Sequence, residues 1–295
     1  QRPESDMLFG YHLMDDVRRR FLIPLWNVYS FFAMYAEVDG WTPAPGRPAT
    51  FSVLDRWITA RLSELVDETT AALEDYDAMR ASRAIETFLD DLSNWYIRRS
   101  RRRFWKSEAD ADKNAAYSTL YAVLTTLIRL LAPFVPFVTE EMYQNLVRSA
   151  YPAAPESVHL SDWPGGERLT DDDRALLADM AAARQAVALG HAIRAAANLK
   201  VRQPLARALV AADAAQSAGI ARLADIVADE LNVKTVVFAG REQDLVSYKL
   251  LPDNKALGPR FGKQFPALRA ALSALDPYAA VQTLRANRPL ALNVE

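Results

Sequence analysis

Residues 117–131 have the sequence YSTLYAVLTTLIRLL, in which apolar positions recur every three or four residues. These positions are Tyr117, Leu120, Leu124, Leu127 and Leu131. The spacing places them on one face of an α-helix and is typical of the seam along which helices pack in a bundle. Pro133 and Pro136 follow and end the helix. The segment therefore predicts a long helix buried along one side.

The same period predicts further helices on both sides of this one. They run from about Phe9 to Val38, onward from about Leu54, onward from about Met79, and after Pro136 to about Val147. A segment rich in Pro and Gly, residues 43–48, predicts a linker after the first helix. We expect the first part of the chain to be an all-α bundle.

The sequence pattern changes after residue 150. A Pro-rich stretch at 151–156 and a turn at 163–166 mark a boundary. Thr170 and the three aspartates that follow it predict the start of a helix that runs to about Asn198, because acidic groups favour a helix N-terminus.

Two short strands, at 205–212 and 233–239, flank a helical segment at 220–231, and two short helical patterns follow. The predicted fold is therefore mainly α, a helix bundle followed by a small α/β domain. The expected divisions are 1–50 for the first helix and linker, 51–165 for the bundle, and 166–295 for the C-terminal domain.

Composition excludes several kinds of site. The 295 residues include 35 basic and 37 acidic residues, so overall charge gives no argument for nucleic-acid binding. The absence of cysteine excludes disulfides, thiolate catalysis and cysteine-based zinc sites, and the three histidines form no metal-binding pattern. No apolar run approaches the ~20 residues that span a bilayer. We expect a soluble, cytoplasmic protein with no metal and no membrane partner.

Residues 94–106, NWYIRRSRRRFWK, hold six basic residues, four aromatic rings and no acid. Guanidinium groups pair with phosphates and aromatic rings stack on bases, so this mixture fits RNA. Arg99 and Arg103 would continue the apolar stripe of the third helix. They must then lie beyond the core or meet acids from a neighbouring helix. The alternative is a solvated basic face with the rings in the core.

The same run resembles a signature of isoleucyl-tRNA synthetases, which are class I aminoacyl-tRNA synthetases. Further stretches resemble that family in the same order along the chain. They are PLWNVYSFF (24–32), DRWI (55–58), LAPFVPF (131–137), HLSDWP (159–164), KVRQPL (200–205), DELNVK (229–234) and LGPRFGK (257–263). One departure is Pro252-Asp253-Asn254, where the family has Pro-Asn-Phe, and it leaves the contacts of that loop unassigned.

The resemblance implies a tRNA-binding part of a ligase that joins isoleucine to tRNA(Ile) with ATP and Mg²⁺. The two ATP motifs of class I enzymes, of the His-Ile-Gly-His and Lys-Met-Ser-Lys-Ser types, are absent from this chain. We therefore expect no catalytic residue and no cofactor in this part. Its expected partners are tRNA(Ile) and the catalytic and editing domains of the same polypeptide. By the resemblance, the chain starts just after the catalytic core and ends before the family's closing segment.

The resemblance also implies RNA-binding residues. Asn27 lies where related bundles supply an asparagine to the anticodon; otherwise it caps a helix or bonds between helices. Candidates for the anticodon stem-loop are Trp95, Arg98, Arg99, Arg101, Arg102, Arg103, Trp105 and Lys106. Some of these arginines are expected to pair with Asp90, Asp91 or Glu86 instead. Candidates in the C-terminal domain are Arg194, Lys200, Arg202, Arg260 and Lys263.

Three alternatives remain. The bundle is shared with valyl- and leucyl-tRNA synthetases, so the chain could be the corresponding region of either. A helical protein-interaction module could use the arginine run to bind an acidic partner. A self-contained helical enzyme is the weakest alternative, because no constellation of catalytic residues supports it.

Overall fold

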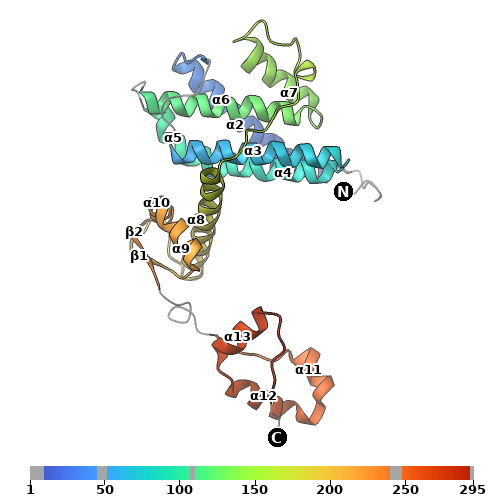
Figure 1. The fold of residues 1–295 in the computed structure, drawn as a ribbon, viewed down its shortest axis with the longest axis vertical. Coiled ribbons are helices and arrows are strands. Elements are labelled where there is room, and N and C mark those ends of the chain that lie inside the picture. Colours follow the sequence, from blue (N-terminus) through green and yellow to red (C-terminus); the bar gives the residue numbers. More distant parts are fainter. Residues whose placement is uncertain (1–9, 45–51, 107–109, 240–247, 293–295) are drawn as a thin grey trace. The chain divides into compact units, whose positions relative to one another are not determined.

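The computed structural model describes residues 10–44, 52–106, 110–239 and 248–292. The chain forms two compact units, residues 1–178 and residues 179–295, and the division falls within one long helix. Residues 45–48 of the predicted linker lie outside the described residues. The helices and strands of both units are labelled in Figure 1.

The first predicted helix is present, with one irregular turn. α1 (Tyr11–Val17) continues through the π-helical turn η1 (Arg18–Leu22) into α2 (Ile23–Val38). A π-turn rotates the helix that follows it relative to a uniform α-helix. The buried stripe of α2 consists of Leu25, Val28, Tyr29, Phe32 and Ala36. α1 has no buried residue, so its apolar side chains lie at the surface.

α3 (Val53–Glu74) and α4 (Ala78–Asp90) lie side by side (Figure 1). α3 begins with a capping box, in which Ser52 and Asp55 each accept a hydrogen bond from the other's backbone amide, at 3.1 and 3.0 Å. α4 continues through a second π-turn, η2 (Asp91–Ile97), into α5 (Arg98–Trp105). The arginine run is therefore helical, but the π-turn shifts its side chains from the positions that a uniform helix predicts.

α6 (Ala111–Leu131) confirms the predicted seam. Leu120, Leu124 and Leu127 are fully buried in unit 1. α7 (Pro136–Tyr143), the π-turn η3 (Gln144–Arg148) and the short 3₁₀ turn η4 (Val158–Leu160) follow. Unit 1 is thus the helix bundle that the periodicity indicated.

The predicted change to α/β structure is confirmed after α8 (Asp171–Ala196). β1 (Leu205–Val210) and β2 (Val233–Phe238) pair in parallel, with Leu205 opposite Val233. Parallel neighbours require a crossover, which here consists of α9 (Ala214–Arg222) and α10 (Ala224–Leu231).

The described residues from 254 to 285 are mostly helical. They form α11 (Asn254–Phe261), η6 (Gly262–Gln264), α12 (Phe265–Ala274) and α13 (Pro277–Arg285). No helix in the described ranges combines the length and apolarity needed to cross a membrane. The mainly α fold with a small α/β part is as predicted.

Candidate nucleic-acid interface

α5 presents basic side chains and one ring to solvent. Arg98, Arg101 and Arg102 are exposed, and Trp105 is 56% exposed. The guanidinium of Arg98 donates to the carbonyl of Asn94, at 2.8 Å. Within the described residues, no carboxylate lies within ion-pair distance of Arg101 or Arg102. These two side chains can therefore reach an external anion without breaking an internal contact.

Arg103 points the other way, into unit 1. Its Nη1 and Nη2 atoms each lie 2.8 Å from an oxygen of Asp55, which is fully buried on α3. Its Nε lies 2.8 Å from Asp112 on α6. Burial opposes the charge, but the hydrogen bond and attraction of Asp55 hold the pKa of Arg103 above its ordinary value. The hydroxyl of Tyr96 donates to the same carboxylate, at 2.7 Å.

For Arg103 the structure has the second of the two expected outcomes, because it meets acids from neighbouring helices, Asp55 on α3 and Asp112 on α6. The acids expected to pair with the run were Asp90, Asp91 and Glu86, which are close in sequence. Asp91 is paired with Arg61 of α3, at 3.0 Å. Arg103 bonds to acids on other helices because the fold brings Asp55 of α3 and Asp112 of α6 to it. We assign Arg103 a structural role.

Trp95 and Lys106, near the two ends of the run, also contact other residues of the bundle. Trp95 is only 6% exposed, and the guanidinium carbons of Arg98 and Arg99 lie 5.7 Å from its ring centroid. Burial leaves little ring surface for a base, so we assign Trp95 to the core. Lys106 lies 2.8 Å from both Asp110 and Asp112, although a third of its side chain remains exposed.

α2 carries the other predicted contact. Asn27 is exposed, and the described residues provide no hydrogen-bond partner for its side chain, so neither capping nor interhelical bonding accounts for it. Trp26 beside it is 44% exposed. Phe31, one turn further along, meets Phe104 of α5 with ring centroids 5.1 Å apart. The exposed side chains of α2 and α5 therefore belong to neighbouring helices.

Trp26 is a candidate that sequence reasoning missed. The predicted base-stacking rings were those within the basic run, whereas Trp26 lies in an apolar stretch. Its place in the helical period gives the signal, since it falls outside the stripe formed by Leu25, Val28 and Phe32.

Arg194, on α8, is buried in unit 2 at 4% exposure. Its guanidinium donates to the carbonyls of Leu231, at 2.7 Å, and Lys200, at 3.1 Å. These bonds tie the end of α8 to the end of α10, so we assign Arg194 a structural role as well. Lys200 and Arg202 are exposed and have no ion-pair partner within the described residues.

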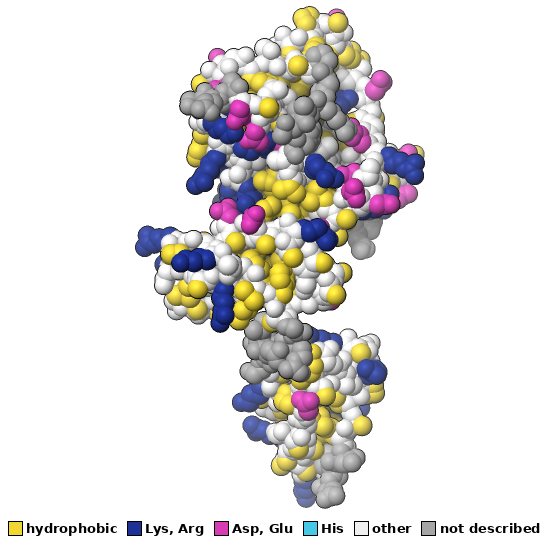
Figure 2. All heavy atoms as spheres, turned by 60° about the vertical axis from the view of Figure 1, so that its left-hand side comes forward, with side chains coloured by type: hydrophobic (Ala, Val, Ile, Leu, Met, Phe, Trp, Pro, Cys, Tyr) yellow, Lys and Arg dark blue, Asp and Glu magenta, His cyan; other side chains and the backbone are white. Residues whose placement is uncertain are grey.

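The two units differ in charge. Residues 1–178 contain 20 basic and 27 acidic residues, whereas residues 179–295 contain 15 basic and 10 acidic residues. Within the second unit, residues 248–292 contain seven basic and two acidic residues. Arg260 and Lys263 are exposed there, without an ion-pair partner among the described residues. Figure 2 shows dispersed basic side chains, with acidic ones among them on the larger body.

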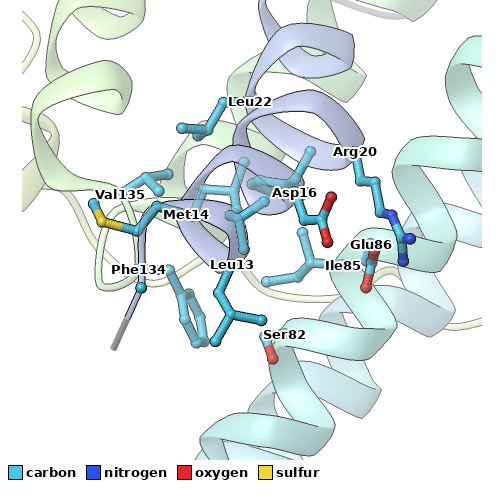
Figure 3. Close-up of a pocket in the computed structure, with 14 residues that line it drawn as sticks. Leu13, Met14, Asp16, Arg20, Leu22, Ser82, Ile85, Glu86, Phe134 and Val135 are labelled. Carbon is cyan, nitrogen blue, oxygen red and sulfur yellow. The ribbon is translucent and has the colours of Figure 1, made fainter. Parts of the chain in front are cut away.

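The N-terminal helix borders an apolar pocket of about 850 Å³ (Figure 3). Leu13 and Met14 of α1 face Ile85 of α4 and Phe134 across it. Leu13 and Met14 are about half exposed. A large apolar surface of this kind is typical of a site that packs against another protein surface. The described residues contain no group of His, Asp and Glu side chains that could hold a metal ion.

Comparison with known proteins gives consistent matches. Residues 55–210 match the family described as "Anticodon-binding domain of tRNA ligase". The chain is 44% identical over 288 residues to the isoleucine--tRNA ligase of Thermus thermophilus, covering 96% of this chain and 27% of that protein. The chain is 42% identical over 301 residues to the isoleucine--tRNA ligase of Deinococcus radiodurans, covering 99% of this chain and 27% of that protein. For the Dehalococcoides mccartyi ligase these values are 49% over 236 residues, 79% and 23%. The chain thus spans about a quarter of these relatives.

Proposed function

This chain belongs to the family of anticodon-binding domains of tRNA ligases, and we propose that it binds the anticodon arm of tRNA(Ile). The observation that carries the proposal is the difference in environment between the arginines of α5. Arg103 is fixed inside the bundle by Asp55, while Arg101 and Arg102 are left for an external anion. An anchored helix with free guanidinium groups is preorganised to bind phosphates.

In this proposal, one set of side chains binds the RNA backbone and another set recognises the bases. Phosphates carry no sequence information, whereas base edges and ring faces do. The phosphates of the RNA backbone are bound by Arg98, Arg101 and Arg102. Asn27 can both donate and accept hydrogen bonds, so it can distinguish one base edge from another. Trp26 and Trp105 offer ring faces on which unpaired bases stack.

The C-terminal unit adds a second basic surface. Lys200, Arg202, Arg260 and Lys263 are exposed and lack acidic partners within the described residues. Unit 1 carries more acidic than basic residues, so phosphate attraction there is local to α5. The excess of basic residues in the second unit supplies a broader attraction to the same RNA.

The parent protein is proposed to be an isoleucine--tRNA ligase, which joins isoleucine to tRNA(Ile) with ATP and Mg²⁺ in the cytoplasm. This chain contributes recognition and positioning. The apolar pocket beside α1 would dock against another domain of that enzyme, because exposed apolar surface is stabilised by burial.

Fluorescence anisotropy with labelled tRNA(Ile) tests the RNA proposal. Binding should weaken with salt, with log K falling by roughly 0.7–0.9 per neutralised phosphate for each unit of log salt. Unlabelled tRNA should displace the label, and polyglutamate at matched charge should not. Displacement by polyglutamate at equal charge concentration would favour the protein-interaction module, and affinity independent of salt would remove the RNA proposal.

A further inference from the structure

A second pocket, of about 370 Å³, lies in unit 1 and shares no lining residue with the apolar pocket beside α1. It is bordered by α6, by α7 with η3, and by the segment that leads to η4. The residues that line it include Tyr121, Thr125, Arg129, Tyr143, Tyr151, Ser161 and Asp162. Its volume lies within the range of pockets that bind small molecules.

The walls of this pocket are held in place by hydrogen bonds to backbone carbonyls. The hydroxyl of Tyr121 donates to Leu146, at 3.1 Å, and that of Tyr143 donates to Pro155, at 2.9 Å. The guanidinium of Arg148 donates to Ala154, at 2.5 Å, and secures the same segment. These hydroxyl protons are occupied, but each hydroxyl oxygen can still accept a hydrogen bond. The pocket is therefore preformed.

Arg129 is the cation of this pocket, and it has no ion pair within the described residues. Its Nε donates to the carbonyl of Thr125, at 3.2 Å, and no carboxylate in those residues lies within ion-pair distance. Arg61 and Arg103, which are also partly buried, each pair with carboxylates. Desolvation lowers the pKa of Arg129, although Tyr143 and the exposed Asp162 act in the opposite direction. The described part of the fold supplies no counter-charge in contact with this guanidinium to offset its burial.

We propose that this pocket binds the phosphate group of a nucleotide, with Arg129 as its anion-binding residue and the rings of Tyr121 and Tyr151 as the wall for the base. A guanidinium pairs with a phosphate through two parallel hydrogen bonds. Ser161, whose hydroxyl has no hydrogen-bond partner within the described residues, lies at the same pocket and can donate a third. The phosphate comes either from a free mononucleotide or from the backbone of a bound RNA. The proposal stands independently of anticodon recognition.

Calorimetric titration of the whole chain with AMP, inorganic phosphate and adenosine tests the site. AMP should bind more tightly than inorganic phosphate, which lacks the base, and more tightly than adenosine, which lacks the charge. Arg129→Gln should weaken AMP by about tenfold or more, Arg129→Lys should weaken it less, and Arg83→Gln on the surface of α4 should change nothing. Equal AMP binding by wild type and Arg129→Gln, or no AMP binding by wild type, would overturn the proposal.

Thermal unfolding separates this role from a structural one. Because the Arg129 charge is desolvated without a carboxylate, Arg129→Gln should melt at or above the wild-type temperature. A large drop would mean that Arg129 stabilises the fold, and the proposal would fail.

Binding of a tRNA stem-loop identifies the source of the phosphate. Arg129→Gln weakens RNA binding if the pocket takes a backbone phosphate and leaves it unchanged if the pocket takes a free nucleotide.

Discussion

Arg103 on α5 holds Asp55 on α3 through two parallel hydrogen bonds of 2.8 Å, and the carboxylate of Asp55 is fully buried. Asp55 also caps the start of α3 and accepts the hydroxyl proton of Tyr96. One carboxylate therefore joins a helix cap, a buried tyrosine and the arginine run. This arrangement makes the run an extension of the bundle and orients its exposed members.

The pair should contribute to stability without contributing directly to RNA contact. Arg103→Ala leaves Asp55 buried without its counter-charge and should destabilise the chain by about 3–5 kcal/mol. The salt dependence of tRNA binding should be unchanged for the fraction that remains folded. Urea unfolding and anisotropy measure the two quantities separately. A reduced salt slope with unchanged stability would show that Arg103 contacts phosphate after all.

Arg101 and Arg102 should behave in the opposite way. Each change to Ala should weaken all tRNAs alike and reduce the salt slope by about 1, because each removes one phosphate contact. The free energy of unfolding should change by no more than about 0.5 kcal/mol, since both side chains are exposed. Arg83→Ala, an exposed change on α4, is the matched control. If Arg101→Ala and Arg83→Ala have the same salt slope for tRNA binding, the result would argue against α5 as the helix that binds the phosphates.

The basic surface of the second unit should add to RNA affinity. A variant with both Arg260→Gln and Lys263→Gln should lower the salt slope by up to about 2, because each side chain would neutralise one phosphate. The control carries Arg83→Gln and Arg168→Gln, which remove the same charge from exposed positions of unit 1. If both double variants weaken tRNA equally, net charge and not this surface is responsible.

Stability should fall in acid partly through Asp39. Its Oδ2 lies 2.6 Å from the Nζ of Lys113 and accepts the hydroxyl proton of Tyr117, and these two contacts lower its pKa. A lowered folded-state pKa stabilises the chain above the ordinary aspartate value of about 3.9, and that contribution is lost as the pH falls below it. Asp39→Asn should cost about 1–3 kcal/mol at pH 7.

The difference in unfolding free energy between wild type and Asp39→Asn should narrow at pH 3, because the carboxyl of the unfolded wild type is then mostly protonated and unfolding takes up a proton. Urea unfolding at the two pH values measures the gap. A gap of the same size at both would show that the charge of Asp39 does not stabilise the fold.

Local patterns predicted the bundle well because helical period and burial are linked. Leu120, Leu124 and Leu127 follow that period and are fully buried. The two strands were also predicted, with their ends shifted, because β1 ends at Val210 and β2 at Phe238, and their parallel pairing comes from the structure. Asp39 and Lys113, in contrast, are far apart in sequence, and no local pattern could pair them.

The candidate site was predicted less completely, for two physical reasons. The helical period placed Arg103 on the apolar stripe, but Asp55 is 48 positions away, so only the fold reveals which acid it meets. The π-turn η2 also breaks the uniform helical step on which the positions of Arg99 and Arg103 were based. The charge of Arg194 suggested an RNA contact, whereas its partners are carbonyl groups, which leave no signal in the sequence.

Base discrimination tests the central claim most directly. The affinity of the chain is measured for an anticodon stem-loop with the isoleucine anticodon and for one with a single base of the anticodon changed. Wild type should prefer the isoleucine loop, Asn27→Ala should reduce that preference, and Arg101→Ala should weaken both loops while keeping their ratio. Trp26→Ala should also weaken both, by about 1–3 kcal/mol if a base stacks there. Equal binding of the two loops by wild type would contradict anticodon recognition by this chain.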